Sequence, residues 1–183
     1  MSIVRPPDYG PAPYRYVAPL MNYLDDSLNA YPQNVPYWSG TCTASAKTDN
    51  SEVRGKYPED GWFVFDVSGL PQGAIINSIT LHGYVNATYD PFWSLTPMGN
   101  INPITASASE IKNYIDTHWD QGIAYIFRQD FDFLTGWHSF PLEPHAFPDL
   151  IDAIPQGWFA CGLSGNFDDP AWYLEFDGWN GND

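Results

Sequence analysis

Acidic side chains occur in close pairs along this chain, and carboxylate oxygens are ligands that calcium prefers. Asp168 and Asp169, together with Asp177 at the end of an expected strand, form the best candidate set for a calcium site. No acidic pair has the Asp-x-Asp-x-Asp-Gly spacing of an EF-hand loop. With 22 acidic residues in the chain, such pairs also arise by chance, so solvated carboxylates are the alternative interpretation. The sequence indicates no other cofactor.

A pair of carboxylates could also serve in catalysis. Glu175 and Asp177 fall on one face of an expected strand, roughly 6–7 Å apart by strand rise. Glycosidases use two carboxylates at comparable distances, but these usually come from different strands that line a cleft. The four histidines lack zinc-binding spacing, neither cysteine lies in a nucleophile motif, and no glycine loop fits a phosphate. We therefore predict that the protein is not an enzyme.

Aromatic and acidic side chains alternate in a pattern that suits sugar binding, because flat rings pack on sugar faces and carboxylates accept hydrogen bonds from hydroxyls. Phe92 and Trp93, in an expected loop, are a second candidate. The alternative is that these rings pack in the core or on strand faces, since eight tryptophans must be placed. The candidate glycan-binding residues are Tyr173, Glu175, Asp177, Trp179, Phe92 and Trp93.

Two cysteines, Cys42 and Cys161, cannot form a metal site between them. They could be joined in one disulfide, or they could be two buried free thiols. The sequence leaves both alternatives open.

The first 36 residues differ in composition from the rest of the chain. Residues 5–20 hold five prolines and three tyrosines, which favours an extended arm because proline removes amide donors. Interfaces are rich in Tyr and Arg and poor in Lys. The arm either contacts a neighbouring chain or folds back on its own domain. The residues expected to make an interchain contact are Tyr9, Tyr14, Arg15 and Tyr16.

The net charge of −15 excludes several classes of partner. Such a surface repels nucleic-acid phosphates and acidic membrane surfaces. No run of about eighteen apolar residues indicates a membrane span. The first residues lack the apolar core of a signal peptide, so we expect either that a leader was removed or that the protein reaches a surface without one, as a component of a virus particle would.

Strands are the main element that the pattern predicts. Aromatic residues make up 17% of the chain, with 17 prolines and 15 glycines, a mixture that favours short strands and many turns. In residues 62–67, Phe63, Phe65 and Val67 share one face of the expected strand, and the residues between them lie on the other face. In residues 158–163 the same period of two places Cys161 on a buried face. Further strands are expected at 75–86, 123–128, 136–142 and 172–179.

Two short helices are expected among these strands. Ser107 and Glu110 match a capping box, which begins a helix within residues 105–118. Pro148 suits the first turn of a second helix that reaches Ile154. The prediction is an all-β antiparallel β-sandwich or jelly roll over residues 37–183, with one or two short helices and an extended N-terminal arm over residues 1–36.

Several segments resemble jelly-roll β-sandwich modules of secreted Bacteroidota-type surface proteins, and more distantly the modules named for an Asp-Asn-Arg-Leu-Arg-Glu motif. The resemblance covers residues 36–180 and implies a fold and a surface location, with no catalytic residues to transfer. Such modules usually continue into a last apolar strand, which this sequence lacks, so we expect an open sheet edge that pairs with another strand. The segments are 36–40 (Pro-Tyr-Trp-Ser-Gly), 61–68 (Gly-Trp-Phe-Val-Phe-Asp-Val-Ser), 70–79, 81–85, 157–163 and 173–180.

Together these observations predict a non-catalytic structural or adhesive subunit of an extracellular or virion surface, such as a virion decoration or fibre, a filament or a cell-surface module. Its partners would be other protein chains, in a homo-oligomer or on a scaffold, contacted through the N-terminal arm and the open sheet edge. The alternative is a carbohydrate-binding module of a secreted protein. Neither nucleic acid nor membrane insertion is expected.

Overall fold

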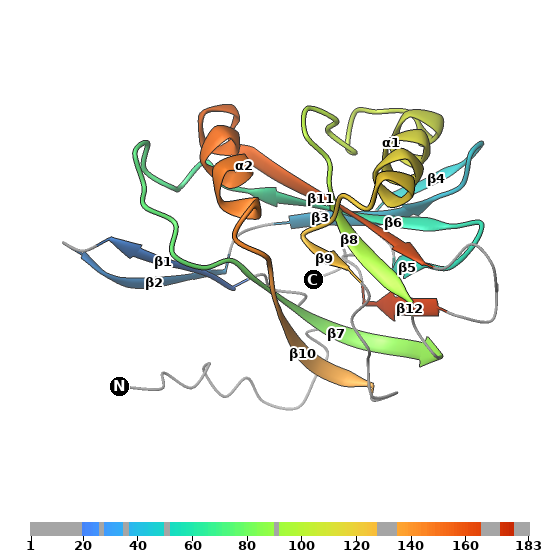
Figure 1. Ribbon diagram of the computed structural model, residues 1–183, viewed down its shortest axis with the longest axis horizontal. Helices are drawn as coiled ribbons and strands as arrows, with labels where there is room; N and C mark the ends of the chain where they lie inside the picture. The colour runs from blue at the N-terminus through green and yellow to red at the C-terminus, as the bar shows by residue number, and fades with distance from the viewer. Residues whose placement is uncertain are drawn as a thin grey trace.

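The computed structural model describes residues 20–25, 28–34, 37–49, 52–89, 92–127, 135–165 and 173–177. These form two six-stranded sheets of antiparallel strands with two short helices, as expected for a β-sandwich (Figure 1). In chain order the elements are β1 (Leu20–Asp25), β2 (Leu28–Asn34), β3 (Tyr37–Cys42), β4 (Lys47–Asp49), β5 (Val53–Gly55), β6 (Asp60–Asp66), β7 (Thr80–Tyr89), β8 (Trp93–Pro97), α1 (Ala108–Gln121), β9 (Ile126–Phe127), β10 (Gly136–Pro141), α2 (Ala146–Ala153), the 3-10 turn η1 (Ile154–Gln156), β11 (Trp158–Gly165) and β12 (Tyr173–Phe176).

The first sheet, which we call sheet A, has the order β2-β1-β7-β12-β5, and β10 pairs with the other side of β7. The second, sheet B, has the order β4-β3-β6-β11-β8-β9. Helix α1 packs on the face of sheet B that points away from sheet A, where Ile111 and Ile115 are buried, whereas the buried Leu150 and Ala153 of α2 belong to the main core. Figure 1 shows both helices above β11. Neither described helix is long and apolar enough to span a membrane.

Two hydrophobic clusters follow from the alternation of side chains on sheet B. Phe63 and Phe65 of β6 point into the main core between the sheets, where they meet Phe159 of β11 and Phe176 of β12. Trp62 on the opposite face of β6 belongs to a second cluster, under α1. The predicted alternation of residues 62–67 and 158–163 is therefore confirmed, including the burial of Cys161.

Helix α1 begins as its sequence predicts. The Ser107 side chain accepts a hydrogen bond from the Glu110 amide, and the Glu110 carboxylate accepts one from the Ser107 amide at 2.8 Å. Gly122 ends the helix in the left-handed conformation that glycine adopts without strain. Ile111 and Ile115 then face sheet B, which anchors the helix on the second cluster.

Several predicted boundaries differ from the structure. The expected strand 75–86, whose alternation places Ile75 on the apolar face and Ile76 on the other, begins only at Thr80. Residues 74–79 form no ladder with a neighbouring strand, and Ile75 is 55% exposed while Ile76 is buried. Of residues 123–127, only Ile126 and Phe127 are in a strand. Within the expected arm, residues 20–34 form the hairpin β1–β2, and Leu20 pairs with Thr80 of β7.

The strand β12 is not at a sheet edge. It pairs with β7 on one side and with β5 on the other, so the place beside the last described strand is filled within the chain. In the described part of sheet A, three strands have a single strand neighbour: β2 and β5 at the two ends of the order, and β10, which pairs with β7 alone. The expected open edge is therefore not next to β12, and β10 is the edge strand that carries the exposed Trp137.

Candidate ligand-binding cleft

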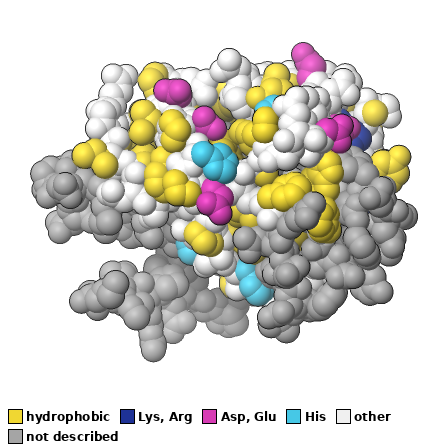
Figure 2. Space-filling model, in the orientation of Figure 1, with side chains coloured by type: hydrophobic (Ala, Val, Ile, Leu, Met, Phe, Trp, Pro, Cys, Tyr) yellow, Lys and Arg dark blue, Asp and Glu magenta, His cyan; other side chains and the backbone are white. Residues whose placement is uncertain are grey.

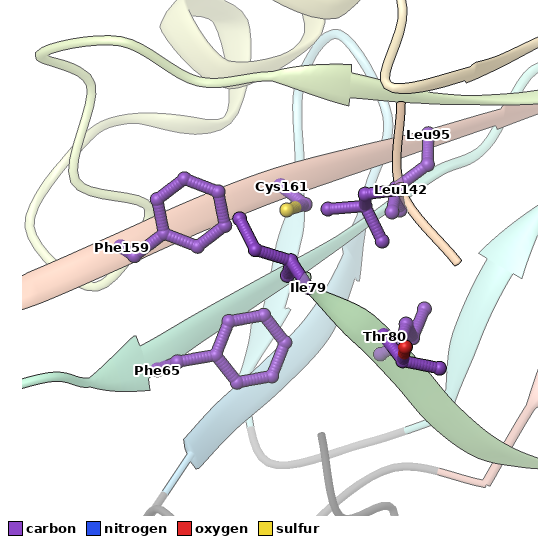
Figure 3. A pocket seen from close by; sticks show the side chains of 8 residues that line it. Phe65, Ile79, Thr80, Leu95, Leu142, Phe159 and Cys161 are labelled. Atoms are coloured by element: carbon purple, nitrogen blue, oxygen red, sulfur yellow. The ribbon is translucent and has the colours of Figure 1, made fainter. Parts of the chain in front are cut away.

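A small apolar cavity lies in the main core between Phe65, Ile79, Leu142 and Phe159 (Figure 3). Its volume is about 10 Å³, which is room for no more than about one water molecule. The side chains around it are apolar apart from Thr80 and the thiol of Cys161. This cavity is a packing defect and not a ligand site.

A larger cleft of about 350 Å³ opens between the two helices, beside β11 of sheet B. We call it the helix cleft. Figure 2 shows the face that carries both helices, where acidic and histidine side chains lie among hydrophobic ones and Lys or Arg side chains appear only at the margin. The residues that line the helix cleft are Pro97, Gly99, Asn100, Tyr114, His118, Tyr125, Asp149, Asp152, Ala153, Gln156, Phe159 and Ala160.

One wall of the helix cleft is a pair of stacked rings on α1. Tyr114 and His118 are one turn apart, with ring centroids separated by 4.2 Å and planes inclined by 26°. The Nδ1 atom of His118 lies 2.8 Å from the carbonyl oxygen of Tyr114. Because a carbonyl oxygen can only accept a hydrogen bond, Nδ1 is the donor, and in the uncharged form of the ring Nε2 is therefore the acceptor. The ring therefore offers a hydrogen-bond acceptor whose orientation is fixed by the helix.

The opposite wall is acidic and comes from α2. The Tyr125 hydroxyl donates to Asp149 Oδ2 at 2.8 Å, and the Tyr125 ring packs on Phe159 with a centroid separation of 5.8 Å. Asp152 follows Asp149 by almost one helical turn, so both carboxylates line the same cleft. Burial, and then the negative charge of Asp149, raise the pKa of Tyr114. The tyrosine hydroxyls of the cleft are thus kept as hydrogen-bond donors at neutral pH.

The charge of the helix cleft selects among ligands. None of the described residues that line it is Lys or Arg, and two are Asp. A ligand with phosphate, sulfate or carboxylate groups would meet uncompensated negative charge there. The aromatic walls, the amides of Asn100 and Gln156 and the carboxylates instead suit a ligand with apolar faces and many hydroxyls, or a cation.

Two of the glycan-binding candidates predicted from the sequence are wrong. Trp93 begins β8 rather than lying in a loop, and its fully buried ring meets Phe140 edge-on at 5.4 Å. Asp177 is buried, because the strand ends at Phe176 and the Asp177 amide donates to the carbonyl oxygen of Tyr84. The predicted strand was therefore too long: the alternation ends at Phe176, and Asp177 does not share the outward face with Glu175.

The structure describes the side chains of two further glycan-binding candidates, Glu175 and Phe92, and only the backbone of a third, Tyr173. Glu175 faces outward as predicted and lies in an ion pair, with Arg54 Nε 2.9 Å from its Oε2. Phe92 packs edge-on against Trp119 and Phe127. Tyr173 pairs through its backbone with Tyr89, and its side chain lies outside the described part of the structure.

Several predicted residues lie outside the described residues, namely Trp179, the calcium candidates Asp168 and Asp169, and the arm residues Tyr9, Tyr14, Arg15 and Tyr16. Among the residues that the structure does describe, no three His, Cys, Asp or Glu side chains are grouped closely enough to hold a metal ion. Asp177, the third calcium candidate, is buried rather than available at a strand end.

The disulfide alternative is wrong, and both cysteines are buried free thiols. Cys161 pairs across the sheet with Phe63 and points into the main core. Cys42 pairs with Asp60 and belongs to the cluster under α1. The two thiols therefore lie on opposite faces of sheet B, where no disulfide can join them.

The outer face of sheet A carries residues that the sequence reasoning missed. Trp137 of β10 is 53% exposed and stacks edge-on against Tyr84 of β7, with a centroid separation of 5.7 Å. His82 and Ser139 follow on the same face, with Nδ1 and Oγ 2.8 Å apart. The sequence could have indicated the exposure of Trp137. Residues 136–141 read as a strand in which Phe140 faces the core, and a period of two then places Trp137 on the outer face.

Comparison of the chain with family models, with curated proteins and with solved structures finds no match. The proposals below therefore depend on the sequence and on the geometry described above.

Proposed function

We propose that this protein is a non-catalytic adhesive module of an extracellular or particle-surface assembly, and that it binds a neutral carbohydrate in the helix cleft. The observation that carries this proposal is a cleft with aromatic walls, several hydrogen-bonding groups and no Lys or Arg among its described residues. Its volume of about 350 Å³ is at the lower end of the range of about 300–1,000 Å³ for small-molecule sites, which suits a short oligosaccharide or the end of a longer one.

The groups of the helix cleft match the needs of a sugar. Sugar hydroxyls can donate to Asp149, to Asp152 and to Nε2 of His118, and they can accept from the Tyr114 hydroxyl. The apolar faces of a sugar ring can pack on the aromatic walls. The resemblance of residues 36–180 to modules of secreted surface proteins supports the same setting.

Binding rather than hydrolysis is the function that the positions of the carboxylates favour. A glycosidase places one carboxyl group on each side of the bond that it cleaves. Asp149 and Asp152 come from one face of a single helix, and Asp149 already accepts a hydrogen bond from Tyr125. This arrangement can hold hydroxyls on one side of a ligand but does not flank a bond from two sides.

The test is a binding screen of the full chain against neutral and charged glycans, followed by titration calorimetry of the best ligand. We expect neutral glycans only, and a loss of affinity of about ten-fold or more for His118→Ala and for Asp152→Asn, because each removes a hydrogen bond to the ligand. Asp120→Asn is the matched control, since Asp120 is exposed on α1 and does not line the cleft.

Two outcomes would count against the helix cleft as the site. Affinity unchanged in both cleft variants but lost in Trp137→Ala would move the site to the outer face of sheet A. Binding confined to anionic glycans would contradict the electrostatic argument, because the cleft has two Asp and, among its described residues, no Lys or Arg.

Contact with other chains is a second candidate function, favoured by one observation on sheet A. The strand β10 pairs with β7 alone among the described strands, and it carries the exposed Trp137. An edge strand with free backbone groups can pair with a strand of another chain, and an exposed tryptophan is typical of an interface.

We expect the full chain to form oligomers whose mass in solution rises with concentration, and Trp137→Ala and a chain without residues 1–20 to form fewer of them. Multi-angle light scattering over a range of concentrations measures this. Ile151→Ala is the control, because Ile151 is also an exposed apolar side chain but lies on α2, outside sheet A. A monomer at every concentration would remove the assembly proposal and leave carbohydrate binding as it stands.

A further inference from the structure

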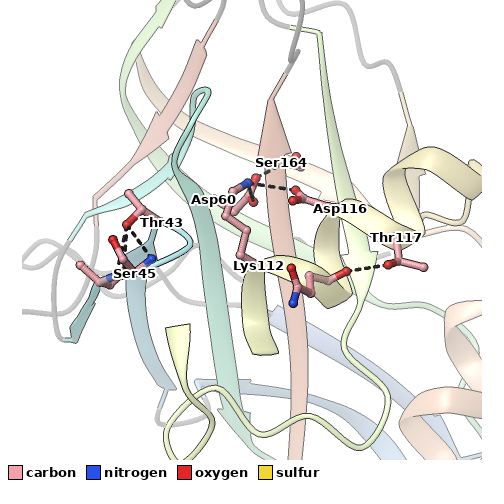
Figure 4. Close-up of polar contacts among 9 residues, drawn as sticks. Thr43, Ser45, Asp60, Lys112, Asp116, Thr117 and Ser164 are labelled. Atoms are coloured by element: carbon pink, nitrogen blue, oxygen red, sulfur yellow. Dashed lines mark hydrogen bonds and ion pairs between the residues drawn. The ribbon is translucent and has the colours of Figure 1, made fainter. Parts of the chain in front are cut away.

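A lysine is buried in the second cluster, between α1 and the start of β6. Lys112 is 7% exposed and its Nζ lies 2.7 Å from Oδ2 of Asp60, which is 1% exposed (Figure 4). Nζ is also 3.0 Å from Oδ1 of Asp116, one turn further along α1. The hydroxyl of Ser164 donates to the other Asp60 oxygen, Oδ1, at 2.8 Å. Lysine and aspartate are almost never buried in this way unless they are paired.

We propose that Lys112 and Asp60 condense to form an amide crosslink between α1 and sheet B, with Asp116 as the proton carrier and Ser164 as the hydrogen-bond donor to the carbonyl oxygen. The four groups supply what amide formation from a carboxylic acid and an amine requires. Lys112 is the nucleophile, Asp60 the electrophile, and the other two groups move or stabilise charge. The proposal is independent of carbohydrate binding, because none of these residues lines the helix cleft.

The reaction balances without any oxidant or added reactant. The ammonium of Lys112 gives one proton to the Asp60 carboxylate, which leaves a neutral amine beside a neutral acid. Nζ attacks Cγ of Asp60, and the hydrogen bond from Ser164 stabilises the negative charge that develops on Oδ1. Asp116 takes a second proton from Nζ and delivers it to Oδ2, which leaves as part of a water molecule. One N–C bond forms, one C–O bond breaks, and Asp116 returns to its initial state.

The structure already holds the reacting atoms close together. A nitrogen that is hydrogen-bonded to one carboxyl oxygen lies about 3–3.5 Å from the carboxyl carbon, the separation of reacting atoms in a near-attack arrangement. Asp60 and Lys112 are held by separate elements whose positions are fixed by the packing of Ile111 and Ile115. The Asp116 side chain is 34% exposed, which opens a route for the released water.

Burial also favours the neutral reactants and the neutral product. It raises the pKa of Asp60 to about 7, despite the opposing effects of Lys112 and Ser164. The pKa of Lys112 is raised overall, because burial lowers it but the attraction of Asp60 and Asp116 outweighs burial while both carboxylates are charged. Once Asp60 is protonated, the larger part of that attraction disappears. Because two buried charges cost much desolvation free energy, an uncharged amide is the more stable occupant of the same space.

The test is the intact mass of the denatured full chain, followed by a tryptic peptide map. We expect the wild-type chain to be lighter than its sequence mass by one water, with no cleavage after Lys112 and with a branched peptide that joins the segments of residues 60 and 112. Lys112→Arg keeps the charge but not the reactive amine, so it should have the full mass. Asp116→Asn should form the crosslink at least about 100-fold more slowly in a time course, because it cannot carry the proton.

A water loss has a second source that the design must separate. Asp60 precedes Gly61, and an Asp-Gly pair can cyclise to a succinimide with the same loss of mass. A succinimide would persist in Lys112→Arg and would give no branched peptide. Such a result, or a wild-type chain of full mass after prolonged incubation in the folded state, would overturn the proposal. If Lys112→Arg does not fold, the peptide map of the wild-type chain decides alone.

Discussion

Replacing Gly165 by Ala should lower the free energy of unfolding by about 3 kcal/mol, at or beyond the upper end of the usual cost of overpacking. A methyl group at this position would meet the backbone of Gly55, with the carbonyl carbon only 2.6 Å away and the carbonyl oxygen closer still. Backbone atoms cannot rotate aside as the end of a side chain can. The strands β5 and β11 would have to separate, and this is where β5 of sheet A lies against sheet B.

The measurement is urea unfolding of Gly165→Ala beside Gly69→Ala. Gly69 lies in a turn with no atom within 4 Å of an added methyl group, so the control should change stability by less than about 1 kcal/mol. Equal stability of the two variants would show that the two sheets do not approach each other as closely at β5 as the structure indicates. Because typical domains are stable by only about 5–15 kcal/mol, the expected loss is a large part of the total.

The sequence predicted the fold where short-range rules decide it. The period of two in residues 62–67 and 158–163 identifies the two faces of central strands, since Phe63 and Trp62 are both apolar but enter different clusters. The capping box of Ser107 and Glu110 identifies the start of α1 to the residue. These signals are local, and tertiary packing agrees with them.

The predictions from local sequence were wrong where the ends of a strand differ from the predicted ends. The pattern through Glu175 places Asp177 outside, but the ladder stops at Phe176 and the chain turns Asp177 inward. Asp90 and Pro91 indicate a loop, and nothing in the sequence shows that β8 begins as soon as Trp93. The same limit applies to the cysteines, whose faces depend on the register of three strands.

The helix cleft could not be predicted because its groups come from distant segments. The spacing of Tyr114 and His118, and of Asp149 and Asp152, was readable as one helix face each. What brings those faces together is the packing of both helices on sheet B, between which Tyr125 lies. Likewise, Lys112 and Asp116 are four residues apart on α1, but Asp60 is 52 residues away in the chain.

Replacing Lys112 by Met should make the stability of the protein fall steeply as the pH rises. Lys112 lowers the pKa of Asp60, so its removal should raise that pKa above the value of about 7 that burial already gives. The carboxyl group of an unfolded chain has a pKa near 3.8. Between these two values the folded state keeps a proton that the unfolded state has lost, and the free energy of unfolding decreases by about 1.4 kcal/mol for each pH unit.

The comparison that isolates Asp60 is Lys112→Met against Lys112→Met with Asp60→Asn, by urea unfolding from pH 5 to pH 8. Neither variant can form the amide with Lys112, so the result does not depend on the crosslink. The two should have similar stability at pH 5, where Asp60 is protonated in the folded single variant. By pH 7 the single variant should be less stable by about 3 kcal/mol, as expected for a buried charge whose partner has been removed. A difference that does not change with pH would mean that water enters beside Asp60 and solvates its carboxylate. In that case the dry environment on which the Lys112–Asp60 reaction depends would not exist.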